Sequence, residues 1–291
     1  MNWPRDFKVR AKYPLKDKTT FRIGGRAQFF SEPGDLTELK SLLRVAKRNK
    51  GPVFILGAGS NLLISDKGVK GLVIKLGSAY FKRIALRADC IEAGSAALLS
   101  QLIKFTQSKS LQGLEFLVGI PGTLGGALAM NAGCWEAAIG DLVKEVSVMD
   151  YNGKIKILSN KDIKFTYRKS ILGKYIILSA RLKLKKGNRT QIQKNINKYL
   201  KFRRLAQDLG RPNAGCIFKN PPQCYAGKLI DLCGLKGKRI GDAFVSERHA
   251  NFILNKGRAS AKDVLALMRI INQKVEDKFK ITLQPEIKIW V

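Results

Sequence analysis

Apolar residues recur at helical spacing in four stretches of the chain. After Asp35, leucines and alanines follow at intervals of three and four residues until Gly51, which predicts a helix with one buried face. Asp35 with Glu38 three residues later is typical of a helix start, because side-chain oxygens at these positions accept backbone N–H groups of the first turn. The predicted helices cover residues 35–50, 96–109, 190–204 and 260–278.

Shorter apolar runs bounded by turn-forming residues predict strands. The segment 143–158 has two such runs around Tyr151-Asn152-Gly153, which predicts a β-hairpin. Further strands are predicted at residues 52–56, 72–76, 174–185 and 286–290. The mixture predicts an α+β protein with several parts. These are a first lobe at residues 1–76, a second lobe at 77–188, a basic linker helix at 189–204 and a C-terminal domain at 205–291.

The charge of the chain is strongly positive. Its 291 residues include 54 Lys or Arg and 22 Asp or Glu, a formal net charge of +32. The excess is uneven, because residues 163–207 contain fourteen Lys or Arg and no acidic residue. Such a surface attracts anions, among them nucleic acid, acidic membranes and phosphorylated small molecules. A lysine-rich solvated surface without a specific partner is also compatible with this composition.

Cysteine usage and the N-terminus are typical of a cytoplasmic protein. The five cysteines form no C-x-x-C pair, which argues against a zinc ribbon, a dithiol redox centre and a secreted disulfide framework. No apolar signal-peptide region follows the first residues. Residues 116–135 carry no charge, but their five glycines and Pro121 lack the apolar bulk of a membrane span. A buried glycine-rich loop with a short helix is expected there.

Two glycine-rich segments are candidate binding loops. Gly57-Ala58-Gly59-Ser60-Asn61 directly follows a predicted strand, and such a turn can bring backbone N–H groups close to a phosphate. The alternative is a tight turn between two strands, since the third glycine and the following helix of the dinucleotide fingerprint are missing. The second segment, residues 119–133, contains five glycines. Tight backbone packing and a flat cofactor explain it equally well.

Together with further motifs, these loops resemble the UDP-N-acetylenolpyruvoylglucosamine reductase (MurB) family over nearly the whole chain. The motifs are TTFRIGG at 19–25, GLEF at 113–116, FTYRKS at 165–170, AGCIFKNP at 214–221, AGKLI at 226–230 and HANFI at 249–253. The resemblance implies a two-lobed FAD-binding domain of the vanillyl-alcohol-oxidase (PCMH) type and a C-terminal α+β substrate domain. The residues implied to hold FAD non-covalently are Gly57, Ala58, Gly59, Ser60, Asn61, Gly119, Ile120, Pro121, Gly122, Gly125, Gly126, Asn131, Ala132 and Gly133.

The resemblance also implies a reaction in two halves. NADPH reduces FAD, and the flavin N5 then gives hydride to the enolpyruvyl methylene of UDP-N-acetyl-3-O-(1-carboxyvinyl)-glucosamine. Protonation of the adjacent carbon yields UDP-N-acetylmuramate, a precursor of bacterial peptidoglycan. Arg168 matches the family arginine that holds the substrate carboxylate, which suits a guanidinium that is always charged and binds carboxylates through two parallel hydrogen bonds.

Two further residues complete the implied catalytic set. Glu286 matches the family's carboxyl partner, and it needs a raised pKa to act beside an anion. Cys216 stands where many family members carry serine, as the proton donor. A thiol has a pKa of about 8.5, so it keeps its proton at neutral pH and yields it more readily than an alcohol. Without the resemblance, Arg168, Glu286 and Cys216 also fit a surface arginine, an exposed strand glutamate and an inert packed cysteine.

Substrate contacts are implied at Lys219, Asn220 and Arg204, the last beside Arg203 where the family places basic contacts to the diphosphate. The family's Gln-Pro pair is here Gln207-Asp208, a departure in that loop. The short distance in sequence from Arg168 to Cys216 resembles the shorter subclass that lacks a tyrosine loop. The single histidine, His249, is expected to be structural, and no metal site is expected. A monomer without membrane insertion is expected.

Two other functions are weighed against the reductase. An oxidoreductase of the same FAD fold with a small alcohol as substrate conflicts with Arg168, Cys216 and Glu286 as a set. A basic nucleic-acid-binding protein fits the acid-free segment 163–207, but no nucleic-acid motif accompanies it. NADPH and a UDP-sugar are polyanions, so their attraction explains the positive charge as well.

Overall fold

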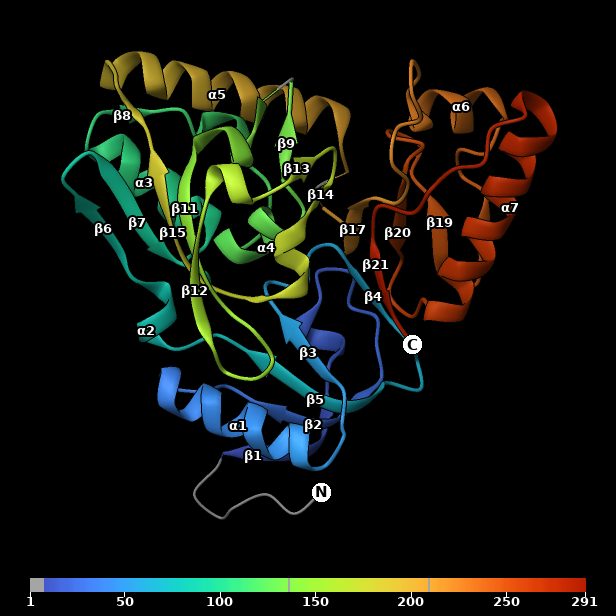
Figure 1. Cartoon of the computed structure of the whole chain (residues 1–291). Coiled ribbons are helices and arrows are strands. Elements are labelled where there is room, and N and C mark those ends of the chain that lie inside the picture. Colours follow the sequence, from blue (N-terminus) through green and yellow to red (C-terminus); the bar gives the residue numbers. More distant parts are fainter. Residues whose placement is uncertain (1–7, 136, 209) are drawn as a thin grey trace. The chain divides into compact units, whose positions relative to one another are not determined.

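The computed structural model describes residues 8–135, 137–208 and 210–291 (Figure 1). The chain divides into two compact units. The first contains residues 8–10, 29–57 and 71–203, and the second contains residues 11–28, 58–70 and 204–291. The predicted lobes therefore differ from the observed units, since two N-terminal segments belong to the same unit as the C-terminal part. The chain passes from one unit to the other within β1 (Val9–Pro14), β2 (Arg26–Ser31), β5 (Val69–Lys75) and α5 (Arg189–Ala206), and also between residues 57 and 58.

Five antiparallel strands form the main sheet of the first unit, in the order β12-β11-β15-β7-β6. The predicted hairpin is confirmed as the first two of these strands. One face of the sheet shares a hydrophobic core with helices α3 (Leu99–Ser108), α4 (Leu124–Ala129) and α5. The strands are β6 (Ile84–Arg87), β7 (Cys90–Gly94), β11 (Val143–Met149), β12 (Ile155–Ser159) and β15 (Ile176–Lys183).

The basic helix predicted at 189–204 is present as α5, and it also packs against the first unit. Ile192 and Ile196, one helical turn apart, are buried in the core of the first unit. A helix that buries apolar residues at this spacing is held by packing along its length, whereas a linker has no such face. One basic residue of the helix, Arg203, is buried along with Ile192 and Ile196.

A second, smaller sheet has the order β1-β2-β5-β3, with β3 (Val53–Leu56) parallel to β5. Helix α1 (Leu36–Arg48) begins as predicted, because Asp35 Oδ1 accepts the N–H of Glu38 at 2.9 Å. The Glu38 carboxylate accepts the N–H of Gly34 at 2.7 Å instead of returning to Asp35. The buried face of the helix consists of Leu39, Leu42, Leu43 and Ala46, and it shares a core with residues of β5.

The second unit contains an antiparallel sheet in the order β17-β20-β19-β18, with α7 (Ala261–Phe279) alongside β19 and β18 (Figure 1). Strand β21 (Lys288–Trp290) pairs in parallel with β4 (Leu62–Ile64). Phe21 and Leu63 are buried in the core that α7 covers. These long-range contacts explain why segments near residues 20 and 60 belong to this unit. The remaining elements here are β17 (Asn213–Cys216), α6 (Ala226–Leu232), β18 (Arg239–Ile240), β19 (Ala243–Val245) and β20 (Phe252–Asn255).

The glycine-rich segment 119–133 forms the predicted loop and short helix, α4. Among the described residues, none of the helices combines the length and the apolar character needed to cross a bilayer. All five cysteines are free thiols. Short elements of the first unit that bear on the site are β8 (Leu111–Gln112), β9 (Gly133–Cys134), β10 (Ala137–Ala138), β13 (Phe165–Thr166) and β14 (Lys169–Ser170).

Candidate functional site

The first candidate loop begins where β3 ends, at Gly57. A Cβ atom at Gly57 would lie 2.9 Å from Thr123 Oγ1. Thr123 is the N-cap of α4, and its hydroxyl oxygen accepts the N–H of Gly126 at 3.3 Å. The absence of a side chain at Gly57 thus lets the strand end approach the start of α4. The two glycine-rich segments that were singled out separately meet at this point in the first unit.

The rest of this loop, residues 58–61, belongs to the second unit. Gly59 has φ +66°, and a Cβ there would lie 2.2 Å from the carbonyl oxygen of Lys18. Its own carbonyl accepts the N–H of Thr20 at 3.2 Å. Among the described residues, no hydrogen-bond partner is found for the N–H groups of Ala58, Gly59 and Ser60. A turn with N–H groups left for an acceptor is what a phosphate of FAD requires, so the loop fits the predicted cofactor.

Tight backbone packing explains part of the 119–133 segment. Gly125 donates its N–H to Ser95 O at 2.8 Å, and a Cβ there would lie 2.9 Å from the Ser95 Cβ. A Cβ at Gly133 would lie 2.2 Å from Ala137 O in the β9–β10 pair. Packing therefore explains these two glycines. Gly119, Pro121 and Gly126 are exposed, so this part of the segment leaves backbone open to a flat ligand.

Asn131 has a role that the sequence did not reveal. It is 8% exposed, its Oδ1 accepts the N–H of Gly140 at 3.0 Å, and its Nδ2 donates to Thr166 O at 3.1 Å. Sequence reasoning placed Asn131 among the FAD contacts, but both ends of its amide are engaged by the protein. The amide holds the β13–β14 hairpin against the loop after α4.

The same hairpin carries Arg168 in its turn, with φ +53°. Ser170 Oγ donates to Leu128 O at 2.8 Å and to Ala129 O at 3.1 Å, so the other end of the hairpin is attached to α4. The Arg168 guanidinium carbon lies 5.1 Å from the centre of the Tyr167 ring. The hairpin that carries the candidate carboxylate clamp is therefore attached to the predicted flavin loop, by Ser170 to α4 and by Asn131 to Thr166.

Cys216 and Glu286 come together in the second unit, although 70 positions separate them in sequence. The N–H of Glu286 donates to Ile217 O at 2.8 Å, and Phe218 forms an antiparallel bridge with Pro285. The N–H of Lys219 donates to Gln284 O at 2.8 Å. Cys216 thus precedes a segment that runs alongside the one carrying Glu286. Both side chains are partly buried.

Asn251 makes hydrogen bonds to the segment that follows Cys216, and Asn61 makes hydrogen bonds to the segment that carries Glu286. Asn251 is buried, and its amide accepts the N–H of Phe218 at 2.9 Å and donates to Phe218 O at 2.8 Å. Asn61 Nδ2 donates to Glu286 O at 3.2 Å, and its own carbonyl accepts the N–H of Lys288 at 3.0 Å. Asn61 therefore links the candidate phosphate loop to the Glu286 segment. The motifs at 57–61 and 249–253 drew attention to these residues, but they gave no sign of these partners.

The implied substrate residues differ in their surroundings. Asn220 Oδ1 accepts the N–H of Ala226 at 3.1 Å, at the start of α6. Lys219 and Arg204 belong to the second unit with Asn220, and the carbonyl of Arg204 accepts Arg248 Nη1 at 3.0 Å.

Arg203 differs from the expectation of a diphosphate contact. It is 8% exposed and lies in the first unit, where it donates to Phe116 O at 3.4 Å and to Cys134 Sγ at 3.3 Å. Its guanidinium also lies 5.4 Å from the centre of the Trp135 ring. These contacts give Arg203 an internal role in the first unit.

Two residues of the second unit act in its local structure. Asp208 stands in place of the proline of the family's Gln-Pro pair. Its carboxylate accepts a hydrogen bond from Ser246 Oγ. His249 Nδ1 accepts the N–H of Asn251 at 3.3 Å, and its ring packs against Phe252. Burial lowers the pKa of His249, so it is neutral in the folded protein at neutral pH.

Both halves of the chain match known protein families. Residues 27–159 match the model of the FAD binding domain, which confirms FAD as the cofactor, and residues 207–290 match the C-terminal domain of UDP-N-acetylenolpyruvoylglucosamine reductase. A solvent-stable cholesterol oxidase, 16% identical with a TM-score of 0.52, covers 64% of this chain and 39% of its own and shares the fold alone. The predicted fold class is confirmed.

Full-length relatives are also found. The UDP-N-acetylenolpyruvoylglucosamine reductases of Caldanaerobacter subterraneus and Clostridioides difficile are 44% and 43% identical, over 98% and 97% of this chain and 94% and 93% of theirs. The crystal structure of the Thermus caldophilus enzyme (MurB) superposes with a TM-score of 0.85 at 37% identity, covering 98% of this chain and 99% of that one. The chain belongs to the UDP-N-acetylenolpyruvoylglucosamine reductase family.

Proposed function

We propose that the protein reduces the enolpyruvyl group of UDP-N-acetyl-3-O-(1-carboxyvinyl)-glucosamine with NADPH, in the synthesis of the peptidoglycan precursor UDP-N-acetylmuramate. The observation that carries the proposal is the hydrogen bond from Glu286 N–H to Ile217 O, which sets a carboxyl group beside the segment of Cys216. The Cys216 thiol can act as a general acid, and the Glu286 carboxyl group lies on the neighbouring segment. This pair suits the protonation of a carbon next to a carboxylate.

Each catalytic residue has one task in this proposal. FAD held by the glycine-rich loops would supply the hydride chemistry that links NADPH to the enolpyruvyl methylene. Arg168 binds the substrate carboxylate and stabilises the negative charge that builds there. Cys216 gives its proton to the carbon next to the methylene. Glu286 influences the protonation state of Cys216. The thiolate left on Cys216 is reprotonated before the next turnover.

The remaining predicted contacts are with the cofactor or with the UDP-sugar. The N–H groups of residues 58–60 would bind phosphate oxygens of FAD, and the partly exposed segment 119–122 would face a flat part of the cofactor. Lys219, Asn220 and Arg204 would contact the UDP-sugar. We further propose that the protein is a cytoplasmic monomer of the subclass without a tyrosine loop. Light scattering on the eluting protein during gel filtration tests the oligomeric state.

The test follows the two half-reactions separately. The purified protein should be yellow, and denaturation should release all the flavin because no residue of the loops is expected to link it covalently. Under anaerobic conditions NADPH should bleach the flavin absorbance, and the enolpyruvyl UDP-sugar should restore it. A colourless protein, or reduced flavin that this sugar fails to reoxidise, would contradict the proposal.

A further inference from the structure

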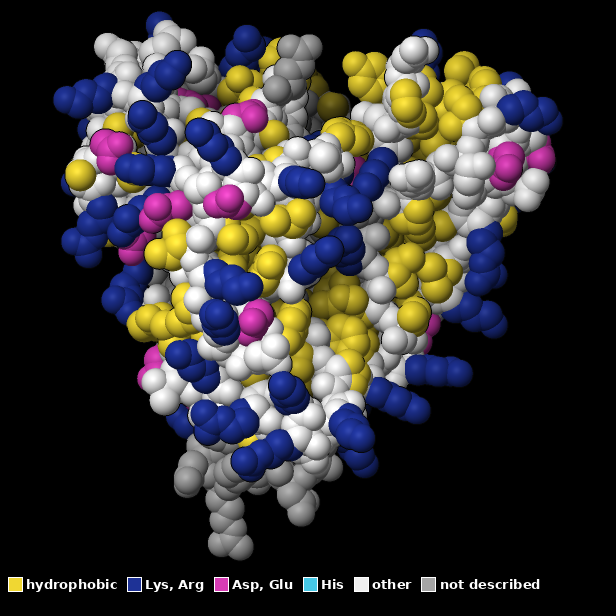
Figure 2. Space-filling view, viewed as in Figure 1, with side chains coloured by type: hydrophobic (Ala, Val, Ile, Leu, Met, Phe, Trp, Pro, Cys, Tyr) yellow, Lys and Arg dark blue, Asp and Glu magenta, His cyan; other side chains and the backbone are white. Residues whose placement is uncertain are grey.

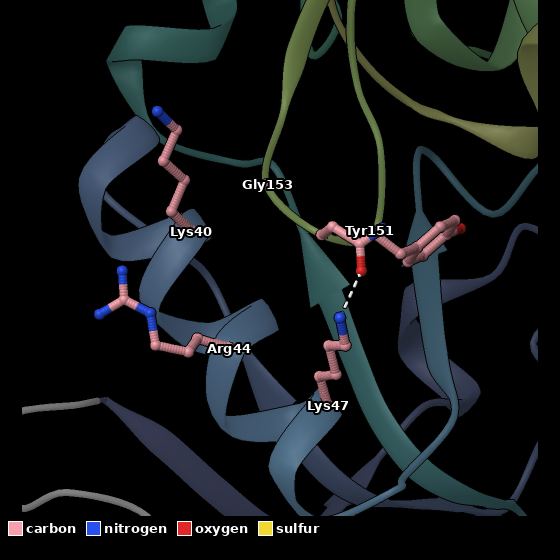
Figure 3. Close-up of a pocket in the computed structure, with 6 residues that line it drawn as sticks. Lys40, Arg44, Lys47, Tyr151 and Gly153 are labelled. Carbon is pink, nitrogen blue, oxygen red and sulfur yellow. Dashed lines mark hydrogen bonds between the residues drawn. The ribbon is translucent and has the colours of Figure 1, made fainter.

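A pocket of about 300 Å³ lies in the first unit, and none of the residues assigned above lines it (Figure 3). One wall is helix α1, and the other is the turn that joins β11 to β12. Pockets of this size are at the lower end of the range that binds small molecules. The lining residues are Lys40, Arg44, Lys47, Tyr151, Asn152 and Gly153.

Three cations of this lining share one face of α1. Lys40, Arg44 and Lys47 are spaced by four and three residues, and their side chains are exposed. Lys47 Nζ donates to Asn152 Oδ1 at 2.8 Å, which joins the helix to the turn. A Cβ at Gly153 would lie 3.6 Å from Lys40 Cγ, so the stem of Lys40 packs against the turn. In Figure 3 the charged ends of Lys40 and Arg44 point away from the turn. Within the described part of the chain, no ion pair involves any of these three cations.

The acidic group closest in sequence to the turn does not neutralise them. Asp150 Oδ1 accepts the N–H groups of Asn152 and Lys154, both at 2.9 Å. The hydrogen bond from Lys154 N–H lowers the pKa of Asp150 most, so the carboxylate is ionised and directed to the backbone of its own turn. The pocket lining therefore carries three positive charges and no carboxylate.

The electrostatics of a helix explain the position of only one of these three cations. A cation in the last turn of a helix is favourable because the C-terminal end carries partial negative charge, and this accounts for Lys47. Lys40 and Arg44 lie nearer the middle of α1, four residues apart, where two like charges destabilise a helix. Much of the surface is basic, as Figure 2 shows, and these three cations in addition line a pocket.

We propose that this pocket binds the oligophosphate group of a small molecule, a chain of two or three phosphates. Seven residues of helix rise by about 10 Å from the first cation to the last, so a single phosphate would reach only part of the set. An arginine fork binds phosphate through two hydrogen bonds, and lysines add point charges beside it. A nucleoside triphosphate and inorganic oligophosphate share this chemistry. The site is separate from the cofactor and substrate residues.

The test is the binding of inorganic triphosphate to the FAD-loaded protein, measured by titration calorimetry at low salt. The pocket variant is Lys40→Gln with Arg44→Gln. The matched control is Lys194→Gln with Lys198→Gln, which removes the same charge from exposed positions of α5 at the same spacing. The pocket variant should bind at least about tenfold more weakly because two charge-assisted contacts are lost, while the control should stay within about twofold of the parent protein.

A second readout tests the location directly. Triphosphate should slow hydrogen exchange of the amides at residues 151–154 in the parent protein and in the control, and should not do so in the pocket variant. The melting temperature and the flavin absorbance of each variant show that it is folded. Equal weakening in both variants would overturn the proposal in favour of diffuse charge, and unchanged binding in the pocket variant would overturn it outright.

Further ligands distinguish the sources of the phosphate. Similar affinities for ATP and triphosphate would show that the pocket reads the phosphates alone. Tighter binding of ATP would show that it also contacts the nucleoside, and either result supports an oligophosphate site. A pocket that binds a single-stranded oligonucleotide and neither small ligand would be a nucleic-acid surface, which contradicts the proposal. None of these measurements depends on reductase activity, so they stand apart from the proposed reaction.

Discussion

Glu286 donates its backbone N–H to the carbonyl of Ile217 at 2.8 Å, and this hydrogen bond sets the candidate carboxyl group beside the residue that follows Cys216. The bond involves backbone atoms only, so it persists when either side chain is changed. Substitutions at Cys216 and Glu286 should therefore alter the chemistry of the site without displacing the two segments. This makes the pair suitable for kinetic tests.

Cys216→Ala should separate the two half-reactions. Reduction of the flavin by NADPH needs no thiol, so its rate should be nearly unchanged. Reoxidation by the enolpyruvyl UDP-sugar should slow by about 10²–10⁴-fold because the general acid is lost. Stopped-flow absorbance of the flavin measures each step.

Two variants control this experiment. Cys216→Ser should keep much of the activity, since serine is the commoner residue at this position of the family, and Cys233→Ala should leave both half-reactions unaffected. Full turnover in Cys216→Ala would mean that Cys216 only packs and that another group delivers the proton. Loss of both half-reactions would indicate a role in folding or in flavin binding.

Asn131→Ala should weaken the attachment of the Arg168 hairpin. Removing the amide leaves the buried Gly140 N–H without its partner, which costs about 1–3 kcal/mol, and it also removes the donor to the carbonyl of the exposed Thr166. The free energy of unfolding in urea should fall, and KM for the enolpyruvyl substrate should rise more than kcat falls. FAD affinity should be retained.

Asn131→Asp is the conservative comparison. Its carboxylate still accepts the N–H of Gly140 but cannot donate to Thr166 O. Any rise in KM in this variant therefore comes from weaker attachment of the hairpin that carries Arg168. If Asn131→Ala instead releases FAD while KM for the sugar is unchanged, Asn131 is a cofactor contact, as the family resemblance implied.

His249 should make the stability of the protein depend on pH. Burial lowers the pKa of His249 in the folded state below 6.5, its usual value. The unfolded chain therefore binds the proton more readily, and the free energy of unfolding should decrease as the pH falls below about 6.5. Urea unfolding between about pH 5.5 and 7.5, where the carboxylates stay ionised, measures the effect.

The chain has a single histidine, so the assignment can be checked with one variant. His249→Gln should flatten the stability profile across this range, whatever its effect on absolute stability. A slope that persists in His249→Gln would assign the titration to another group.

The basic surface should increase the rate of association with anionic substrates. Figure 2 shows Lys and Arg side chains over much of the visible face, with few acidic ones among them. Two of the scarce carboxylates, Glu92 and Glu145, both pair with Arg181, each at 3.0 Å. The net field is therefore positive, and kcat/KM for NADPH should fall as salt rises while kcat changes less. A kcat/KM that does not depend on salt would show that the charge has no role in association.

Sequence alone predicted the features that depend on neighbours in the chain. The start of α1 at Asp35, the hairpin around Tyr151-Asn152-Gly153 and the buried face of α7 all result from residues a few positions apart. Caps, turns and helical faces are short-range, so their residue patterns carry the information directly. The order of the motifs was enough to predict the FAD fold and the family.

The partners of the site residues were decided by the tertiary structure. Asn131 and Thr166 are 35 positions apart, Glu286 and Asn61 are 225 apart, and neither pair leaves a pattern in the chain. Arg203 and Arg204 are neighbours in sequence, yet the first is buried against Cys134 and the second is exposed. A polar side chain takes the partner that packing brings within hydrogen-bond distance, and packing depends on how the elements pair across the whole fold, which local sequence does not encode.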